Sequence, residues 1–281
     1  MRSILLRAEL HAHTNASDGQ HTPAELVALA RDQGLDLLAI TDHDTTAGIA
    51  PARLAAGGRL VILPGIELSA EDGGDDVHML GYDFDPEDAG LQAALADFRA
   101  RRDARAREMV ERLNSLGVPV AWERVEALAA GGSVGRPHVA RAMAETGVVE
   151  TVREAFDLYL HNGGPAYVAR QRLSPEEAIA LIHRAGGAAV LAHPGLLADW
   201  RAMIERLAPA RLDGVEVAHP KNNADVRLEL RGLAARFGLI MTGGSDFHGR
   251  AVSDAMLGSI TPPAGAVAAI YERAARRKAE R

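Results

Sequence analysis

The chain has 281 residues, of which 47% are hydrophobic, 25% are charged and 4% are aromatic. This is the composition of a globular protein, and the length suits one large α/β domain or two ordinary ones. Cysteine is absent, which excludes disulfides, thiolate zinc sites, iron–sulfur clusters and thiol nucleophiles. The net charge of -7 argues against a general nucleic-acid coating role, which needs a basic surface.

The lack of cysteine contrasts with a total of 11 histidines. A metal bound by this chain must therefore be held by imidazoles and carboxylates. No run approaches the roughly 18 apolar residues of a membrane helix. Arg7 and Glu9 interrupt the first apolar segment before it could serve as a secretory signal. We therefore expect a cytoplasmic protein with no membrane association, and no obligate protein partner is indicated.

Short apolar runs alternate with helical patterns, which is typical of βα units and a parallel sheet. The predicted strands cover residues 4–10, 35–41, 60–67, 77–82, 188–192, 214–217 and 239–242. Two helices are expected to begin with capping boxes at Thr22 and Ser174, because each hydroxyl is followed by proline and, three positions on, by glutamate.

The middle of the chain breaks this alternation. Residues 91–126 have the pattern of a long helix with a turn at 114–119, and no strand signal appears there. We therefore interpret residues 96–167 as a helical insertion, or cap, between a first part of the α/β domain at 1–95 and a second part at 168–281.

Histidines and acids gather at the predicted strands, mostly at their carboxyl ends, where the loops of a closed parallel α/β barrel build an active site. They are His11 and His13 after the first strand, His43 after the second, Glu67 at the end of the third, His78 within the fourth, His193 after the fifth, and Asp246 and His248 after the last. Scattered structural histidines would have no reason to choose strand ends. The sequence therefore predicts a metal site at the mouth of one barrel.

The spacing of these residues suits metal binding. His11 and His13 alternate, so in an extended segment both rings leave on the same side and can grip one ion. Glu67 can bridge two cations with its two oxygens. Mixed nitrogen and oxygen donors suit Mn, Fe or Zn, and Mg less well, because Mg prefers oxygen. Simpler explanations exist for single residues, such as a turn for Asp18 or a half-buried strand position for His78.

The motifs around these residues have a specific combination and order. They are Glu9-Leu10-His11-Ala12-His13-Thr14, Ser17-Asp18-Gly19, Thr41-Asp42-His43-Asp44, Gly65-Ile66-Glu67, His78, Ala192-His193-Pro194 and Gly244-Ser245-Asp246-Phe247-His248. In these motifs the chain resembles the polymerase and histidinol phosphatase (PHP) family of metal-dependent phosphoesterases. It is most similar to the subgroup that acts on nucleoside 3′,5′-bisphosphates and short 5′-phosphorylated oligonucleotides. The resemblance covers essentially the whole chain and implies an α/β fold, a distorted seven-stranded (β/α)7 TIM-like PHP barrel with a helical cap.

The resemblance also implies two to three divalent metals per chain, with Mn the first choice. It assigns His11, His13, Glu67 and Asp246 to the first metal, Glu67, His78 and His193 to the second, and Asp18, His43 and His248 to the third. It further implies substrate contacts from Arg99, Arg102, Arg136 and His138 in the cap. Surface or structural roles are left for His21, His161, His183 and His219.

The leading hypothesis is a hydrolase that removes the 3′-phosphate of nucleoside 3′,5′-bisphosphates, such as adenosine 3′,5′-bisphosphate, which yields AMP. A metal-bridging hydroxide would attack phosphorus in line, with no side-chain nucleophile. The same site could trim short RNA or DNA oligonucleotides as a 5′-3′ exonuclease. Two alternatives stay open: a histidinol phosphatase or other small-molecule phosphatase, and a non-catalytic metal-binding regulatory module.

Overall fold

The computed structural model describes residues 6–129, 134–168, 173–249 and 255–281, so residues 4 and 5 of the first predicted strand lie outside the described residues. The chain divides into two compact units: unit 1 is Met1–Gln92 with Arg172–Arg281, and unit 2 is Ala93–Gln171. In the part of the chain that the structure describes, no helix combines the length and the apolar character that a membrane span requires.

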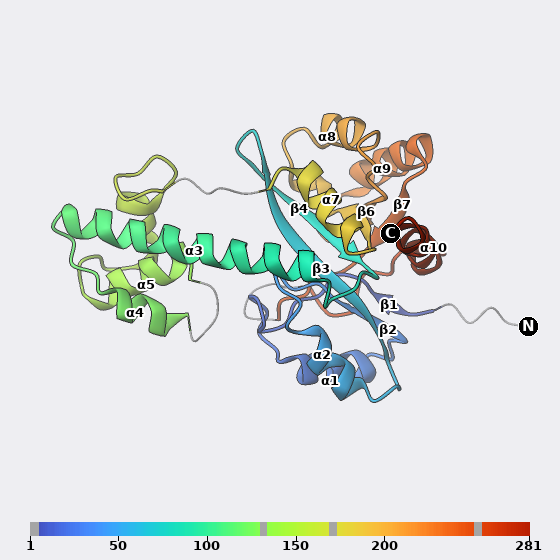
Figure 1. Cartoon of the computed structure of the whole chain (residues 1–281), viewed down its shortest axis with the longest axis horizontal. Coiled ribbons are helices and arrows are strands. Elements are labelled where there is room, and N and C mark those ends of the chain that lie inside the picture. Colours follow the sequence, from blue (N-terminus) through green and yellow to red (C-terminus); the bar gives the residue numbers. More distant parts are fainter. Residues whose placement is uncertain (1–5, 130–133, 169–172, 250–254) are drawn as a thin grey trace, which may run out of the picture. The chain divides into compact units, whose positions relative to one another are not determined.

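Unit 1 is built on a sheet whose seven strands, counted over the described residues, follow one another in chain order (Figure 1). They are β1 (Ala8–Glu9), β2 (Leu37–Ile40), β3 (Val61–Asp72), β4 (Asp75–Tyr82), β5 (Ala188–Leu191), β6 (Gly214–Ala218) and β7 (Ile240–Gly243). Each predicted strand is present. Beyond β1 and β7, Ala12 forms a parallel bridge with Phe247, which almost closes the sheet into a barrel.

The expectation of a wholly parallel sheet is wrong at β4, which runs antiparallel to both β3 and β5. Gly73 and Gly74 connect β3 to β4 with φ angles of 57° and 97°. A two-residue turn can join only antiparallel strands, and glycine adopts such positive φ values without strain. The strand β3 also continues to Asp72, so Glu67 lies within the strand and not at its end.

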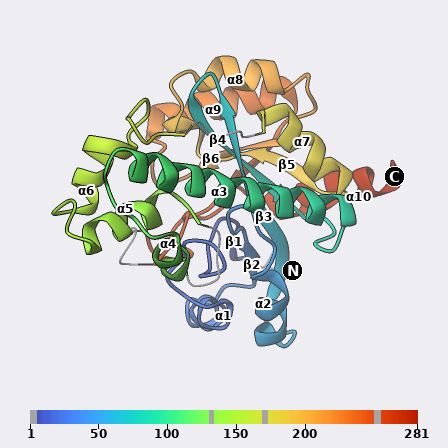
Figure 2. The same ribbon diagram turned by 60° about the vertical axis from the view of Figure 1, so that its left-hand side comes forward.

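Helices pack around the strands of unit 1, as Figures 1 and 2 show. They are α1 (Pro23–Asp32), α2 (Ile49–Ala56), α7 (Pro175–Arg184), the short 3₁₀ helix η2 (Pro194–Leu196), α8 (Trp200–Leu207), α9 (Ala224–Phe237) and α10 (Ala266–Ala279). The predicted capping boxes at Thr22 and Ser174 are both formed, which confirms the starts of α1 and α7.

The inside of the barrel is a packed core. One buried cluster joins residues of β1 to β5 and β7, and of the segments that follow them, with two residues of α10: Ala8, Leu10, Leu37, Ala39, Leu63, Leu80, Tyr82, Val190, Ala192, Ile240, Ala266 and Ile270. Tyr82 is fully buried, and its hydroxyl donates to the carbonyl of Leu10 at 2.8 Å. This core fixes the segment after β1, where the first histidines stand.

Unit 2 contains only helices among its described residues. The helix α3 (Ala89–Ser115) begins in unit 1 and continues into unit 2, where α4 (Trp122–Leu128), α5 (Arg136–Glu145), α6 (Val152–Ala155) and the π-helix η1 (Phe156–Leu160) follow. Unit 2 has a hydrophobic core of its own, which includes Met109, Leu113, Val139, Met143 and Leu160.

Candidate metal centre

The first group of candidate ligands lies at the end of β1. His11 and His13 are fully buried, and their Nε2 atoms lie 3.2 and 3.1 Å from Oε2 of Glu67. Oδ1 of Asp246, which follows β7, lies 3.3 Å from each of the same two nitrogens. These four donor atoms lie within 4.8 Å of one another and could hold one metal ion. They are the four residues assigned to the first metal from the sequence.

A second group surrounds the other oxygen of Glu67. Its Oε1 lies 2.8 Å from His78 Nδ1 and 3.0 Å from His193 Nε2. Glu67 and His78 are diagonal neighbours on one face of the antiparallel β3–β4 pair, so the reversed direction of β4 delivers His78 to the site. His43 lies between the two groups: its Nδ1 is 3.3 Å from Oε2 of Glu67, and it could hold a metal together with Glu67 and His78.

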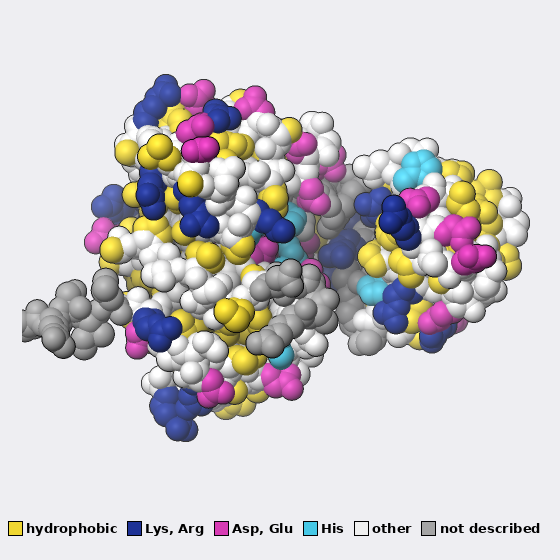
Figure 3. Space-filling view, turned by 180° about the vertical axis from the view of Figure 1, so that it is seen from behind, with side chains coloured by type: hydrophobic (Ala, Val, Ile, Leu, Met, Phe, Trp, Pro, Cys, Tyr) yellow, Lys and Arg dark blue, Asp and Glu magenta, His cyan; other side chains and the backbone are white. Residues whose placement is uncertain are grey.

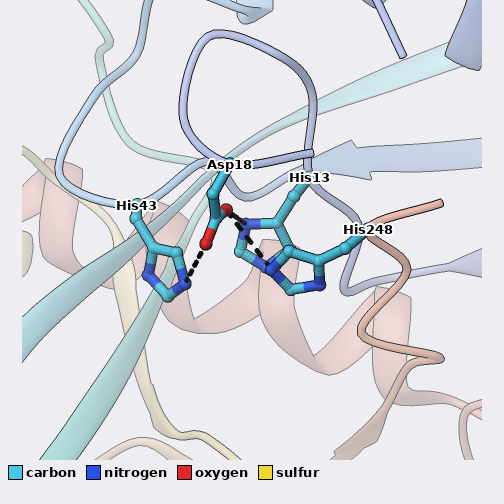
Figure 4. Close-up of side chains that lie close together, drawn as sticks. All are labelled: His13, Asp18, His43 and His248. Carbon is cyan, nitrogen blue, oxygen red and sulfur yellow. Dashed lines mark ion pairs between the residues drawn. The ribbon is translucent and has the colours of Figure 1, made fainter. Parts of the chain in front are cut away.

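The third group centres on Asp18, whose carboxylate points between His43 and the pair formed by His13 and His248 (Figure 4). Its Oδ1 lies 3.3 Å from His248 Nε2 and 3.7 Å from His13 Nδ1, and its Oδ2 lies 3.8 Å from His43 Nε2. The structure thus brings the three residues predicted for a third metal together and adds His13 to them. Asp18 is the most exposed member of this group, with 56% of its side chain accessible.

The backbone at the site is held in uncommon conformations. Asp246 and His193 have φ angles of 52° and 26°, in the left-handed region that most residues avoid. Gly244, after β7, packs against the first histidine: a Cβ there would lie 2.4 Å from the Cβ of His11. Such strain persists only where the surroundings over-determine it, and it is typical of functional sites.

Two buried carboxylates stand behind the ligands, and the sequence assigned no role to them. Oε1 of Glu216 lies 3.1 Å from His11 Nδ1, and its Oε2 accepts the backbone N–H of His193 at 2.8 Å. Glu9 accepts the backbone N–H groups of His11 and Ser245. A carboxylate on one ring nitrogen fixes the tautomer and leaves the other nitrogen for a metal. The only signal for Glu216 is a single acid inside the apolar run 214–217.

Burial and the opposite charges shift the pKa values at the centre. Burial by itself would raise the pKa of Glu67, but His43, His11 and His78 hold it well below its ordinary range. Burial also opposes protonation of His13, and the nearby carboxylates of Asp246 and Glu67 nevertheless raise its pKa to about 9. In the same way Glu67 and Asp76 raise the pKa of His78 to about 10. The carboxylates therefore favour positive charge at this place, whether it comes as protons or as metal ions.

Several ring nitrogens at the centre lack a hydrogen-bond partner in the part of the protein that the structure describes and are suited to bind metal ions. Both nitrogens of His13 and the Nδ1 atoms of His43, His78 and His193 are buried, yet none makes a hydrogen bond of normal geometry with any described group. Buried polar atoms almost always have a hydrogen-bond partner. Unpaired imidazole nitrogens beside the carboxylates of Glu67 and Asp18 therefore fit the coordination of divalent cations. Figure 3 shows histidine and acidic side chains side by side on one face of unit 1.

The predicted substrate contacts all lie in unit 2. Nη1 of Arg136, the first residue of α5, donates to Leu160 O at 3.2 Å and to Asn162 Oδ1 at 3.1 Å. His138 Nδ1 accepts the N–H of Gly135 at 3.1 Å, and burial, Arg141 and Arg102 lower the pKa of His138. A Cβ on Gly135 would lie 3.5 Å from Nη2 of Arg102, which places Arg102 beside the start of α5. Arg99 lies one turn before Arg102 on α3.

Comparison with known proteins identifies relatives along most of the chain. The PHP domain matches residues 9–121. The chain is 40% identical over 247 residues to the 5′-3′ exoribonuclease Rnm of Salmonella typhimurium, covering 85% of this chain and 84% of that protein. It is 38% identical over 246 residues to the 3′,5′-nucleoside bisphosphate phosphatase of Chromobacterium violaceum, covering 85% and 86%. A Bifidobacterium adolescentis structure, assigned as a metal-dependent phosphoesterase, superposes with a TM-score of 0.79 at 38% identity and covers 95% of this chain and 96% of that one.

The barrel, the ligand groups and these relatives define a metal-dependent hydrolase of phosphate esters. The chain belongs to the PHP family. The family, the barrel class and the enzyme class expected from the motifs are therefore confirmed.

Proposed function

We propose that this enzyme removes the 3′-phosphate of nucleoside 3′,5′-bisphosphates, and that it also trims short 5′-phosphorylated oligonucleotides from the 5′ end. The observation that carries the proposal is the set of candidate ligands gathered around the two oxygens of Glu67. The substrate class is supported by the Chromobacterium and Salmonella relatives, which are named for these two activities. The proposal includes a cytoplasmic location, where nucleotides and RNA are turned over.

We propose three metal positions, which the distances between the candidate ligands support. His11, His13, Glu67 and Asp246 would hold the first ion, Glu67, His78 and His193 the second, and Asp18, His43 and His248 the third. Six imidazoles beside three carboxylates favour Mn over Mg, which prefers oxygen and water. When bound, the divalent ions lower the pKa of water and neutralise phosphoryl oxygens.

Hydroxyl groups close to the centre are engaged as hydrogen-bond donors. Thr14 Oγ1 donates to Asp42 Oδ2 at 2.7 Å, and Ser17 Oγ donates to Oδ1 of the same carboxylate at 2.8 Å. Ser245 Oγ donates to Glu9 Oε2 at 2.6 Å. These hydroxyls hold the carboxylates of Asp42 and Glu9 in place, and the nucleophile of the proposed reaction is water.

The arginines of unit 2 are proposed to bind the phosphate that is not hydrolysed. A guanidinium offers five N–H donors in a planar fork that matches two phosphate oxygens. Among the residues that the structure describes, Arg136 donates hydrogen bonds only through Nη1. Arg99, Arg102 and His138 are proposed to complete this contact. A substrate with two phosphates uses such a group better than histidinol phosphate, which carries one.

The test is phosphate release by Mn-loaded enzyme from adenosine 3′,5′-bisphosphate, histidinol phosphate and a 5′-phosphorylated trinucleotide, with metal content measured in parallel. We expect turnover of the first and third substrates, and loss of turnover in His13→Ala and Glu67→Ala proteins that remain folded. The exposed Glu25→Ala variant controls for removal of a carboxylate. Preference for histidinol phosphate would refute the substrate assignment, and normal turnover by both site variants would refute the metal assignment.

A further inference from the structure

The two oxygens of Asp246 face different groups. Oδ1 faces the candidate metal ligands: it lies 3.3 Å from both His11 Nε2 and His13 Nε2 and 3.5 Å from His248 Nδ1. Oδ2 lies 3.5 Å from Nε2 of His219. His219 stands just beyond β6, is 2% exposed, and was expected from the sequence to have only a surface or structural role. The second oxygen of a candidate ligand is thus paired with a buried imidazole outside the ligand groups.

The tautomer of His219 follows from its other nitrogen. Nδ1 lies 3.2 Å from the backbone N–H of Lys221. A backbone N–H can only donate, so Nδ1 is the acceptor and the neutral ring carries its proton on Nε2. Nε2 of His219 makes no hydrogen bond of normal geometry with any described group, and Oδ2 of Asp246, 3.5 Å away, is the acceptor that lies beside it. The separation of 3.5 Å is longer than an ordinary hydrogen bond, and such contacts tighten when an active site is fully assembled.

The backbone segment around His219 is held by several hydrogen bonds. Its carbonyl accepts from Arg227 Nη2 at 2.8 Å and from the N–H of Asn222 at 3.1 Å. The side-chain amide of Asn222 donates to the carbonyls of Glu216 and Val217 at 3.1 Å each. These bonds hold the imidazole in place and make it a firm anchor for a neighbouring side chain.

The side chain of Asp246 must be held in one orientation if it is to bind a metal. Its φ of 52° is in the left-handed region, so its backbone is in a strained conformation that local contacts must hold. The backbone of its neighbour Ser245 is fixed by Glu9, which accepts the Ser245 N–H at 2.9 Å. This contact does not set the rotation of the Asp246 side chain. On the side of Oδ2, His219 is the described group close enough to set it.

We propose that His219 is a positioning residue: its Nε2–H holds Oδ2 of Asp246, so that Oδ1 is presented to the metal. This rests on the first metal position proposed above. His219 itself does not bind the metal or the substrate. Its removal should therefore weaken metal binding and leave the chemistry intact once metal is supplied in excess.

The test compares two variants that differ in where they place an amide. In His219→Gln the amide reaches the position of Nε2 and can still donate to Asp246, whereas in His219→Asn it reaches only the position of Nδ1. Mn²⁺ affinity is measured on metal-free protein by competition with a chelating dye, without substrate. We expect a loss of about 10–100-fold for His219→Asn, affinity close to that of the wild type for His219→Gln, and recovery of kcat for His219→Asn at saturating Mn²⁺. His21→Phe, which keeps its ring against Phe247, is the matched control and should bind Mn²⁺ normally.

A double-variant cycle separates positioning from direct ligation. The Asp246→Asn background tolerates the left-handed backbone and lacks the carboxylate, so His219→Asn should cause no further loss of affinity there. An equal further loss in that background, equal weakening by His219→Gln and His219→Asn, or unchanged affinity in His219→Asn would each overturn the proposal. If His219→Asn does not fold, His219→Phe takes its place, with the same expected loss. Because no substrate is present, failure of the proposed nucleotide activity leaves this result readable.

Discussion

Glu9→Gln is a small chemical change that should lower the stability of the folded protein, because Glu9 is a buried acceptor of hydrogen bonds. Its carboxylate is fully buried and accepts four hydrogen bonds. Oε1 accepts the N–H groups of His11 at 3.0 Å and Ser245 at 2.9 Å. Oε2 accepts the Ser245 hydroxyl at 2.6 Å and the N–H of Gly258 at 2.9 Å. Glu9→Gln keeps the shape of the side chain and converts one of these two acceptors into an NH₂ donor.

The cost follows from the two orientations that the amide can take. If the NH₂ group replaces Oε1, it meets two backbone N–H groups and both lose their acceptor. If it replaces Oε2, the Ser245 hydroxyl can rotate to accept, and only the N–H of Gly258 is left unsatisfied. The second orientation is cheaper, and one buried unsatisfied donor costs about 1–3 kcal/mol. For a protein of this size a loss of about 2 kcal/mol lowers Tm by about 4–8 °C.

Calorimetry of metal-free Glu9→Gln measures this shift without interference from metal affinity. The control is Glu272→Gln on the exposed side of α10, which removes the same charge and should stay within about 0.5 kcal/mol of the wild type. Burial raises the pKa of Glu9, and its four donors oppose the rise. A Glu9→Gln protein as stable as the control would mean that a neutral side chain fits, and the reasoning from a carboxylate with four donors would be refuted.

Three further outcomes are expected. Metal at 100 times its Kd should stabilise the folded protein by about 2.7 kcal/mol, so a chelator should lower Tm in calorimetry, and an unchanged Tm would contradict the metal centre. Tyr82→Phe removes the buried bond to Leu10 O and should cost about 1 kcal/mol in urea unfolding; no change would show that this bond contributes nothing. His183 and Arg277 donate to buried Asp213, and despite burial they help hold its pKa below 3.8. This stabilisation is present above pH 3.8 and is lost as pH falls through the lower folded pKa, so Asp213→Asn should unfold with a flatter acid dependence below about pH 4, and an unaltered acid profile would contradict the assignment.

The positions of the strands and the identity of the candidate ligands could be predicted because both depend on local pattern. Apolar runs mark the strands, and His11, His43 and His193 lie two or three residues beyond the ends of three of them. The direction of β4 was missed, although Gly73-Gly74 between two β-rich runs is a hairpin signal. That error matters for the site, because His78 reaches Glu67 through antiparallel register and not through a shared strand end.

The groups behind the ligands could not be predicted, since their partners are remote in sequence. Glu216 meets His11 across 205 residues, and Glu9 meets Ser245 across 236. In the sequence each acid looks like an isolated interruption of an apolar strand, and no spacing rule connects it to its partner. Only closure of the barrel, which brings the segments after β1 and β7 side by side, creates these contacts.

Closure of the barrel also explains how a protein with an apolar core can bury the histidine and carboxylate side chains of the candidate metal centre. Below the site the core is apolar and excludes water, so the buried candidate ligands must either form hydrogen bonds with nearby groups such as Glu9, Glu216 and His219 or coordinate a metal ion. The layer satisfies the backbone N–H groups of His11 and His193 and one ring nitrogen of His11. Both ring nitrogens of His13 and Nδ1 of His43 and His78 are left without a hydrogen bond of normal geometry among the described residues. Metal affinity should therefore depend both on the ligands and on Glu9, Glu216 and His219 behind them. Variants of these three residues should change the affinity although every ligand is kept.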